Sequence, residues 1–79
     1  MATKAFVLVE IAVGKSREVV DALRKLESIT SVDAVTGPYD VIAVIEAPDL
    51  NAIGDLITKQ VHTVQGVLRT VTCLATPVS

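Results

Sequence analysis

The feature that most constrains this sequence is a five-residue turn, Thr36–Asp40 (Thr-Gly-Pro-Tyr-Asp), with an apolar run on each side. Pro38 fixes the backbone φ angle at about −65° and Gly37 tolerates positive φ, so the chain can reverse within a few residues. The flanking runs, 32–35 and 41–45, consist mainly of aliphatic residues, as buried strands do. Because so short a connection joins antiparallel neighbours, the sequence predicts a hairpin at the middle of the chain.

Apolar periodicity predicts one strand and one helix before this hairpin. Residues 5–13 alternate as a strand does, with β-branched side chains on one face and a mixed set on the other. The two sets are Val7, Val9, Ile11 and Val13, and Phe6, Leu8, Glu10 and Ala12. A helix is predicted over about 16–28, with Ser16 as its N-cap. Its apolar stripe consists of Val19, Ala22, Leu23 and Leu26.

The hairpin itself is predicted to join strands 31–36 and 40–47, the second of which ends at Pro48. A second helix then begins with Asp49 or Asn51 as its cap and ends near Gly66. Its apolar residues are Leu50, Ile53, Leu56, Ile57, Val61 and Val64. Gly54 inside this helix is interpreted as a close helix contact, because glycine is otherwise unfavourable there. A last strand is predicted over 67–75, followed by a short tail, 76–79.

This order, β-α-β-β-α-β, predicts an α+β fold, the ferredoxin-like sandwich with two helices on one face of a four-stranded antiparallel sheet. The length of 79 residues leaves room for a single domain, residues 1–79. The sheet is apolar on its second face as well, where Phe6, Leu8, Ile42 and Val44 are predicted to lie. A sheet with one wet face would carry polar residues there. We therefore expect two chains to pair through their sheets as a dimeric α/β barrel.

Composition and charge exclude several functions. The net charge is −2, the pI is about 5.1 and the basic residues are scattered, so direct nucleic-acid binding is not expected. The single cysteine, Cys73, excludes an intramolecular disulfide and a CxxC metal pair, and neither a metal nor a cofactor is predicted. The apolar run 5–13 is too short for a membrane span and lacks a cleavage signal. The expected setting is the cytoplasm.

The central turn concentrates the residues suited to recognition. Asp40 can hold the ammonium group of an amino acid, or it can accept N–H bonds within its own turn. Gly37 can let the backbone approach a ligand carboxylate, or it can serve the turn conformation alone. Tyr39 can line a pocket or, as we prefer, pack against a neighbouring dimer.

Other polar residues are weaker candidates. Hydroxyl groups of Thr36, Thr70 and Thr72 can bond a ligand, although threonine is common in strands. His62, without a second His or a Cys nearby, is interpreted as a capping or solvent-facing residue near a helix end. Cys73 shares a strand face with Val71 and is interpreted as a small buried hydrophobic residue.

Three stretches carry a family resemblance: Val32-x-x-Val-Thr-Gly-Pro-Tyr-Asp40, Ala47-Pro-Asp-Leu50 and Gly66-Val-x-Arg-Thr-x-Thr72. With them the chain resembles a stand-alone RAM domain, the effector-binding module at the C-terminus of Lrp/AsnC-type transcriptional regulators. The resemblance covers residues 4–75. It implies dimeric α/β barrels assembled into rings of dimers, with amino-acid effectors bound between dimers near the hairpin. It favours ligand contact for Asp40. The helix-turn-helix domain of the full regulators is not seen in this sequence.

The leading hypothesis is a non-enzymatic, oligomeric module that senses an amino acid or related small metabolite. Its expected partners are further copies of itself, the effector and a full-length Lrp/AsnC regulator. The alternative is a small dimeric α/β-barrel enzyme of the isomerase or monooxygenase type. Such an enzyme needs a positioned acid–base pair, and none is visible in the sequence. A third hypothesis is a structural oligomer that scaffolds other proteins.

Overall fold

The structure, a computed structural model, describes residues 2–76, so the predicted tail beyond Thr76 lies outside the described residues. The elements, in chain order, are β1 (Thr3–Ile11), α1 (Ser16–Arg24), β2 (Ile29–Ala34), β3 (Val41–Ala47), α2 (Leu50–Leu56), the π-helical turn η1 (Ile57–Val61) and β4 (Val67–Leu74). The strands form one antiparallel sheet in the order β2-β3-β1-β4. This confirms the predicted ferredoxin-like α+β fold.

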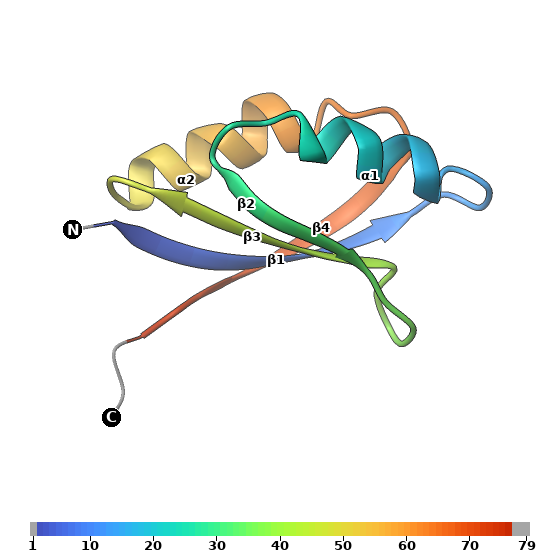
Figure 1. Cartoon of the computed structure of the whole chain (residues 1–79), viewed down its shortest axis with the longest axis horizontal. Coiled ribbons are helices and arrows are strands. Elements are labelled where there is room, and N and C mark those ends of the chain that lie inside the picture. Colours follow the sequence, from blue (N-terminus) through green and yellow to red (C-terminus); the bar gives the residue numbers. More distant parts are fainter. Residues whose placement is uncertain (1, 77–79) are drawn as a thin grey trace.

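Both helices lie on one face of the sheet (Figure 1). The pleat directs every second side chain of β1 and β3 toward them, and the core forms in between. On the strands it contains Ala5, Val7, Val9, Ile11, Ile29, Val32, Val41, Ala43, Ile45 and Ala47. On the helical segments it contains Val19, Val20, Leu23, Ile53, Leu56, Ile57 and Val61. This face is the covered face.

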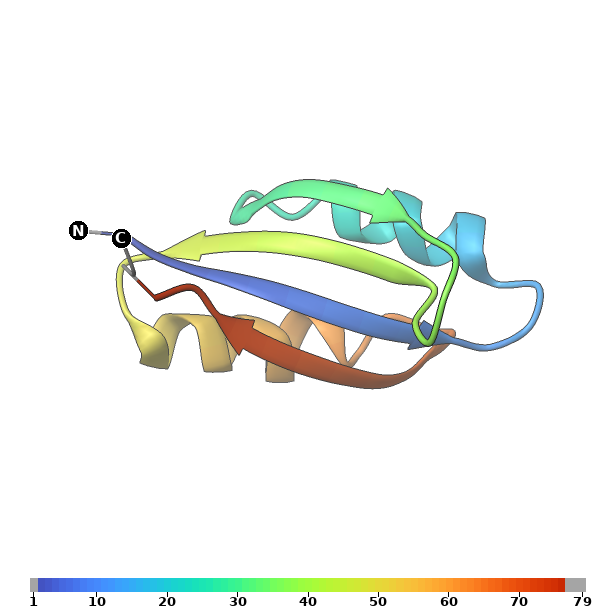
Figure 2. The same cartoon turned by 90° about the horizontal axis from the view of Figure 1, so that it is seen from below.

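No helix or strand among residues 2–76 covers the opposite face of the sheet (Figure 2). The registers of β1 with its two neighbours place six apolar side chains on it: Phe6, Leu8, Ile42, Val44, Val71 and Cys73. We call these six residues the open face. Phe6 and Val71 are each 37% exposed. Cys73 is exposed too, which corrects the prediction that it is buried. Alternation with Val71 identified its face correctly, but that face is not covered by the chain's own helices.

The predicted hairpin is confirmed. Ala34 pairs with Val41, and the Val35 N–H donates to the carbonyl oxygen of Asp40 at 2.9 Å, which closes the loop. The loop projects on the side of the sheet opposite the helices (Figure 1) and crosses the end of β1 (Figure 2). The hairpin therefore borders the open face.

The boundaries of α1 differ from the prediction at both ends. Lys15, not Ser16, is the N-cap, and it makes no side-chain capping bond. The helix ends at Arg24 rather than near residue 28, because the next N–H groups switch to shorter bonds. Lys25 donates to the Ala22 carbonyl oxygen and Leu26 to that of Leu23, so the chain tightens into a turn.

The second helix begins as predicted. The Asp49 side chain accepts a hydrogen bond from the Ala52 N–H at 2.8 Å and caps α2. The helix then widens into η1, where the His62 N–H donates to the Ile57 carbonyl oxygen, five residues back. Three details of the prediction are wrong. The helical segment ends at Val61 rather than near Gly66, because the chain turns after His62. Leu50 is exposed rather than part of the core. A Cβ atom built on Gly54 would meet nothing within 4 Å, so this glycine makes no close helix contact.

The end of β1 and the loop before β4, which both lie next to α1, also differ from what the sequence predicts. Strand β1 stops at Ile11, so Val13 does not share its core face and is fully exposed. The loop before β4 instead packs closely on α1. Gly66 has a φ of +106°, and a Cβ there would lie 2.9 Å from the Lys15 Cβ. Its carbonyl oxygen accepts a bond from the Ala12 N–H at 2.8 Å, so Gly66 holds the start of β4 against the start of α1.

Candidate functional site

The loop between β2 and β3 has the backbone that the turn chemistry predicts. Gly37 has a φ of +141°, a conformation that side-chain-bearing residues rarely adopt. A Cβ built there would meet no atom within 4 Å, so the space beside this glycine is open. Thr36, next to it, is exposed. The turn therefore needs glycine for its conformation and also leaves its backbone accessible from outside.

Asp40 connects the hairpin to β1. Its backbone N–H donates to the Val9 carbonyl oxygen at 3.0 Å, and its carboxylate oxygen Oδ2 accepts the Ile11 N–H at 2.8 Å. The pairing of β1 with β3 ends at Val9 and Val41, so no β3 carbonyl accepts that N–H. Asp40 therefore has a structural role, but its bond goes to β1 and not to its own turn. Its other oxygen, Oδ1, has no hydrogen-bond partner among residues 2–76.

Tyr39 contacts the open-face side of β4. The Arg69 Nη2 donates to the Tyr39 hydroxyl at 3.5 Å, and the Arg69 guanidinium carbon lies 5.8 Å from the centre of the ring. Arg69 also pairs with Glu10, its cross-strand neighbour, with 3.5 Å between Nε and Oε1. This chain of contacts fixes the hairpin over the ends of β1 and β4.

The threonines of β4 lie elsewhere. Thr70 pairs with Val9 and Thr72 with Val7, and these two valines point to the covered face. The Thr70 hydroxyl oxygen lies 2.7 Å from His62 Nε2, so it is bonded to the end of η1. The structure brings Thr36, Gly37, Tyr39 and Asp40 together in one loop but does not bring Thr70 or Thr72 to it.

Sequence reasoning missed the residues that hold the hairpin, Glu10 and Arg69. Arg69 was part of a recognised motif, but its partner is Tyr39, 30 residues away in the sequence. Only the strand order, which places the end of β1 between the hairpin and β4, brings the two together. The sequence does contain a signal for this contact: an acidic residue near the end of one predicted strand and an arginine near the start of another. Such residues form a cross-strand pair if the two strands are antiparallel neighbours.

The remaining sequence expectations concern His62, metals and membranes. His62 is exposed and ends η1, as predicted for a solvent-facing residue near a helix end. Across residues 2–76, His, Cys, Asp and Glu side chains form no group of three or more that would suit a metal ion. No helix in the same range is long and apolar enough to cross a membrane.

Comparison with protein families decides the identity of the domain. The model of the Lrp/AsnC ligand-binding domain matches residues 4–77. The chain belongs to this family. Lrp/AsnC ligand-binding domains serve transcriptional regulation, typically by sensing amino acids, and they are not enzymes. Family membership therefore removes the enzyme alternative.

Solved structures support the same assignment. The chain is similar to TTHA0845 from Thermus thermophilus, with 31% identity and a TM-score of 0.92 over 98% of this chain and 96% of that one. It is also similar to FFRP-DM1, with 30% identity and a TM-score of 0.89 over 94% of this chain and 99% of that one. E. coli AsnC shares the fold at 15% identity and a TM-score of 0.89, and the match covers 98% of this chain and 54% of AsnC. The search of curated proteins gave no match.

Proposed function

We propose that this Lrp/AsnC domain senses a small amino acid or related metabolite, which binds at the central hairpin. The supporting observation is the state of the Asp40 carboxylate: one oxygen is fixed by the Ile11 N–H and the other is available. A carboxylate held in this way can accept charge-assisted hydrogen bonds from an α-ammonium group without first being ordered. Gly37 offers backbone beside open space for the α-carboxylate.

The proposal includes self-association through the open face. Its six apolar side chains cover β1, β3 and β4, and burying a single aliphatic or aromatic side chain contributes about 1.5–3 kcal/mol. A second copy of the chain supplies the same apolar surface for burial. Tyr39 stands at the border of this face, held by Arg69, so it is suited to contact a neighbouring dimer in a ring. A ligand bound at the hairpin then touches a subunit interface, which allows binding to affect assembly.

A transcriptional role is proposed through another protein. With a net charge of −2, this chain has no electrostatic basis for binding duplex DNA by itself. A full-length Lrp/AsnC regulator, with a domain of the same fold, is the proposed partner. The proposed setting is the cytoplasm, where such regulators act.

The test combines an amino-acid screen with substitutions at Asp40. A thermal-shift screen with the twenty standard amino acids identifies a ligand, because a ligand that binds only the native state raises apparent stability. Asp40→Asn is then expected to weaken binding by about ten- to hundred-fold, as expected for losing a charge-assisted hydrogen bond. The fold should persist, because the Asn side-chain oxygen still accepts the Ile11 N–H. Calorimetric titration measures the affinity.

Two further variants make this result specific. Asp40→Ala removes the acceptor for Ile11 as well, so it should also lower the free energy of unfolding by about 1–3 kcal/mol. Asp55→Asn removes the same charge from an exposed position on α2 and should leave affinity unchanged. Full affinity in a folded Asp40→Asn variant would show that the effector does not bind at the hairpin.

A further inference from the structure

A hollow lies between α1 and the free side of β2, on the side of the sheet that the helices cover. This α1–β2 hollow has a volume of about 300 Å³ and is lined by Ser16, Arg17, Val20, Asp21, Arg24 and Ala34. The volume is at the lower end of the roughly 300–1,000 Å³ found for small-molecule sites. None of these residues belongs to the hairpin site.

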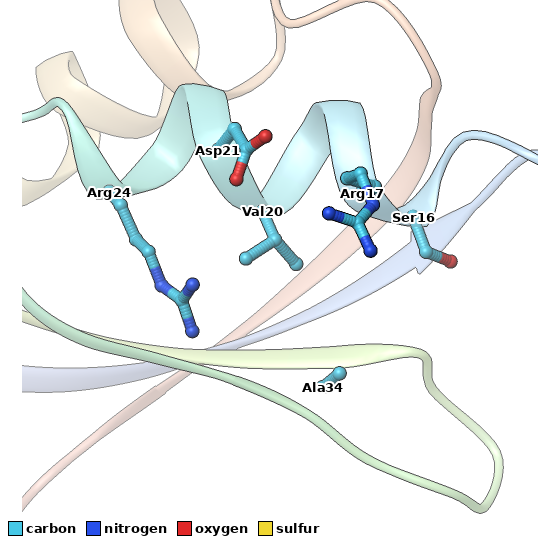
Figure 3. A pocket seen from close by; sticks show the side chains of 6 residues that line it. All are labelled: Ser16, Arg17, Val20, Asp21, Arg24 and Ala34. Atoms are coloured by element: carbon cyan, nitrogen blue, oxygen red, sulfur yellow. The ribbon is translucent and has the colours of Figure 1, made fainter.

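The hollow has an apolar side chain between two guanidinium groups. Val20, only 9% exposed, points from α1 toward β2, where the exposed Ala34 lines the opposite side (Figure 3). Arg17 and Arg24 stand on either side of Val20, and Arg24 extends from the helix toward the sheet (Figure 3). Seven residues, about two helical turns, separate the two arginines, so they lie on one side of α1. A small molecule whose apolar group contacts Val20 therefore has a cationic side chain on each side of it.

The guanidinium groups retain donors for a ligand. Arg24 uses Nη2 for one hydrogen bond to the Val32 carbonyl oxygen at 3.2 Å, and a guanidinium carries five N–H donors. Within residues 2–76, neither Arg17 nor Arg24 forms an ion pair. Because the bond to Val32 already restricts the Arg24 side chain, this side chain loses less conformational entropy when a ligand binds.

Asp21 determines which class of ligand fits. It lies four residues after Arg17 and three before Arg24, on the same side of the helix, and also lines the hollow. An anion alone would contact an arginine but leave this carboxylate without a cationic partner. A zwitterion would place its carboxylate against one of the two arginines and its ammonium group against Asp21. We propose that the α1–β2 hollow binds a small zwitterion with a short aliphatic side chain, separately from the hairpin. The proposal shares its ligand class with the proposed function but does not depend on it.

The experiment uses L-valine and two analogues, each of which lacks one charged group. N-acetyl-L-valine has no ammonium group, and isobutylamine has no carboxylate. Each is titrated into the isotope-labelled chain while backbone amide shifts are followed by NMR. L-valine is expected to shift the amides of α1 and Ala34, and both analogues are expected to bind at least about tenfold more weakly.

Substitutions locate the binding. Arg17→Gln and Asp21→Asn are each expected to weaken L-valine binding by about ten- to hundred-fold. Lys25→Gln, which removes a charge from the end of the same helix outside the hollow, serves as the matched control and should change nothing. Arg24→Gln is less suitable because it also removes the bond to Val32.

The outcomes separate this proposal from the hairpin proposal. Shifts in α1 that persist in Asp40→Asn support a site in the hollow, whatever happens at residues 35–40. An absence of shifts in α1 with millimolar L-valine would overturn the hollow proposal and leave the hairpin proposal untouched. Equal binding of N-acetyl-L-valine would also overturn it, because an anion site would then suffice. Loss of all shifts in Asp40→Asn would assign the binding to the hairpin alone.

Discussion

The covered face and the open face of the sheet carry similar aliphatic side chains, but their surroundings differ. On the covered face, Val7 is 1% exposed and Ile45 is fully buried by the helices. On the open face, Phe6 and Val71 retain more than a third of their surface in solvent. Successive residues of a strand point to opposite faces of the sheet. The helices lie on one face only, so they can bury only half of the apolar side chains on these strands. The difference indicates that the covered face stabilises the fold, and it is the basis of the proposal that the open face mediates self-association.

The largest expected effect tests the covered face. Leu23 is a fully buried residue of α1. Its replacement by Ala should lower the free energy of unfolding by about 2–5 kcal/mol, because the change removes apolar contacts and leaves a cavity. Denaturant unfolding followed by circular dichroism measures this loss. Leu50→Ala, at a position 58% exposed, is the matched control and should cost little. Equal losses in the two variants would contradict the assignment of the core.

The next prediction tests the open face. Val71→Asp should prevent self-association, because each copy would bury an unpaired carboxylate at a cost of several kcal/mol. Light scattering and sedimentation measure the oligomeric state. Val13→Asp introduces the same group at a fully exposed position away from this face and should leave assembly intact. Assembly that survives Val71→Asp unchanged would show that copies associate through another surface.

The smallest expected effect separates folding from assembly. Gly54 lies on the outer side of α2, where a Cβ meets nothing within 4 Å. Gly54→Ala should therefore stabilise the chain by about 0.5–1 kcal/mol through helix propensity alone. The oligomeric state should not change, because the substitution touches neither face of the sheet. A thermal melt combined with light scattering on the same sample tests both statements. A stability gain accompanied by a change in assembly would mean that the two faces are not independent.

Local patterns were sufficient to predict the fold. Alternation in β1 and β3, the Gly37 turn and the Asp49 cap each depend on residues close together in sequence, and all three are confirmed. The errors arise where packing between segments far apart in the sequence determines the burial or bonding of a residue. Cys73 has the alternation of a buried residue, but whether its face is covered depends on where both helices pack. Ser16 is a good cap by composition, but the backbone places Lys15 at that position.

The candidate site was predicted only in part for the same reason. Gly37 and Asp40 were identified from the turn itself. The partner of Asp40, the Ile11 N–H, is available only because the pairing of β1 with β3 ends at Val9 and Val41. The contact between Arg69 and Tyr39 likewise requires the strand order. Thr70 and Thr72 remain predictions as ligand contacts, and in this chain they lie on the covered side of β4.

The hydrogen bond from Arg24 to Val32 has a consequence for solubility. Val35 donates to Asp40 across the hairpin, so by the alternation of antiparallel pairing the backbone groups of Val32, three residues earlier, point away from β3. They belong to the free edge of the sheet, where an unpaired carbonyl invites a strand from another molecule. Arg24 occupies that carbonyl and places a positive charge beside it. The same side chain therefore blocks one of the backbone groups that a strand from another molecule would use to extend the sheet at this edge.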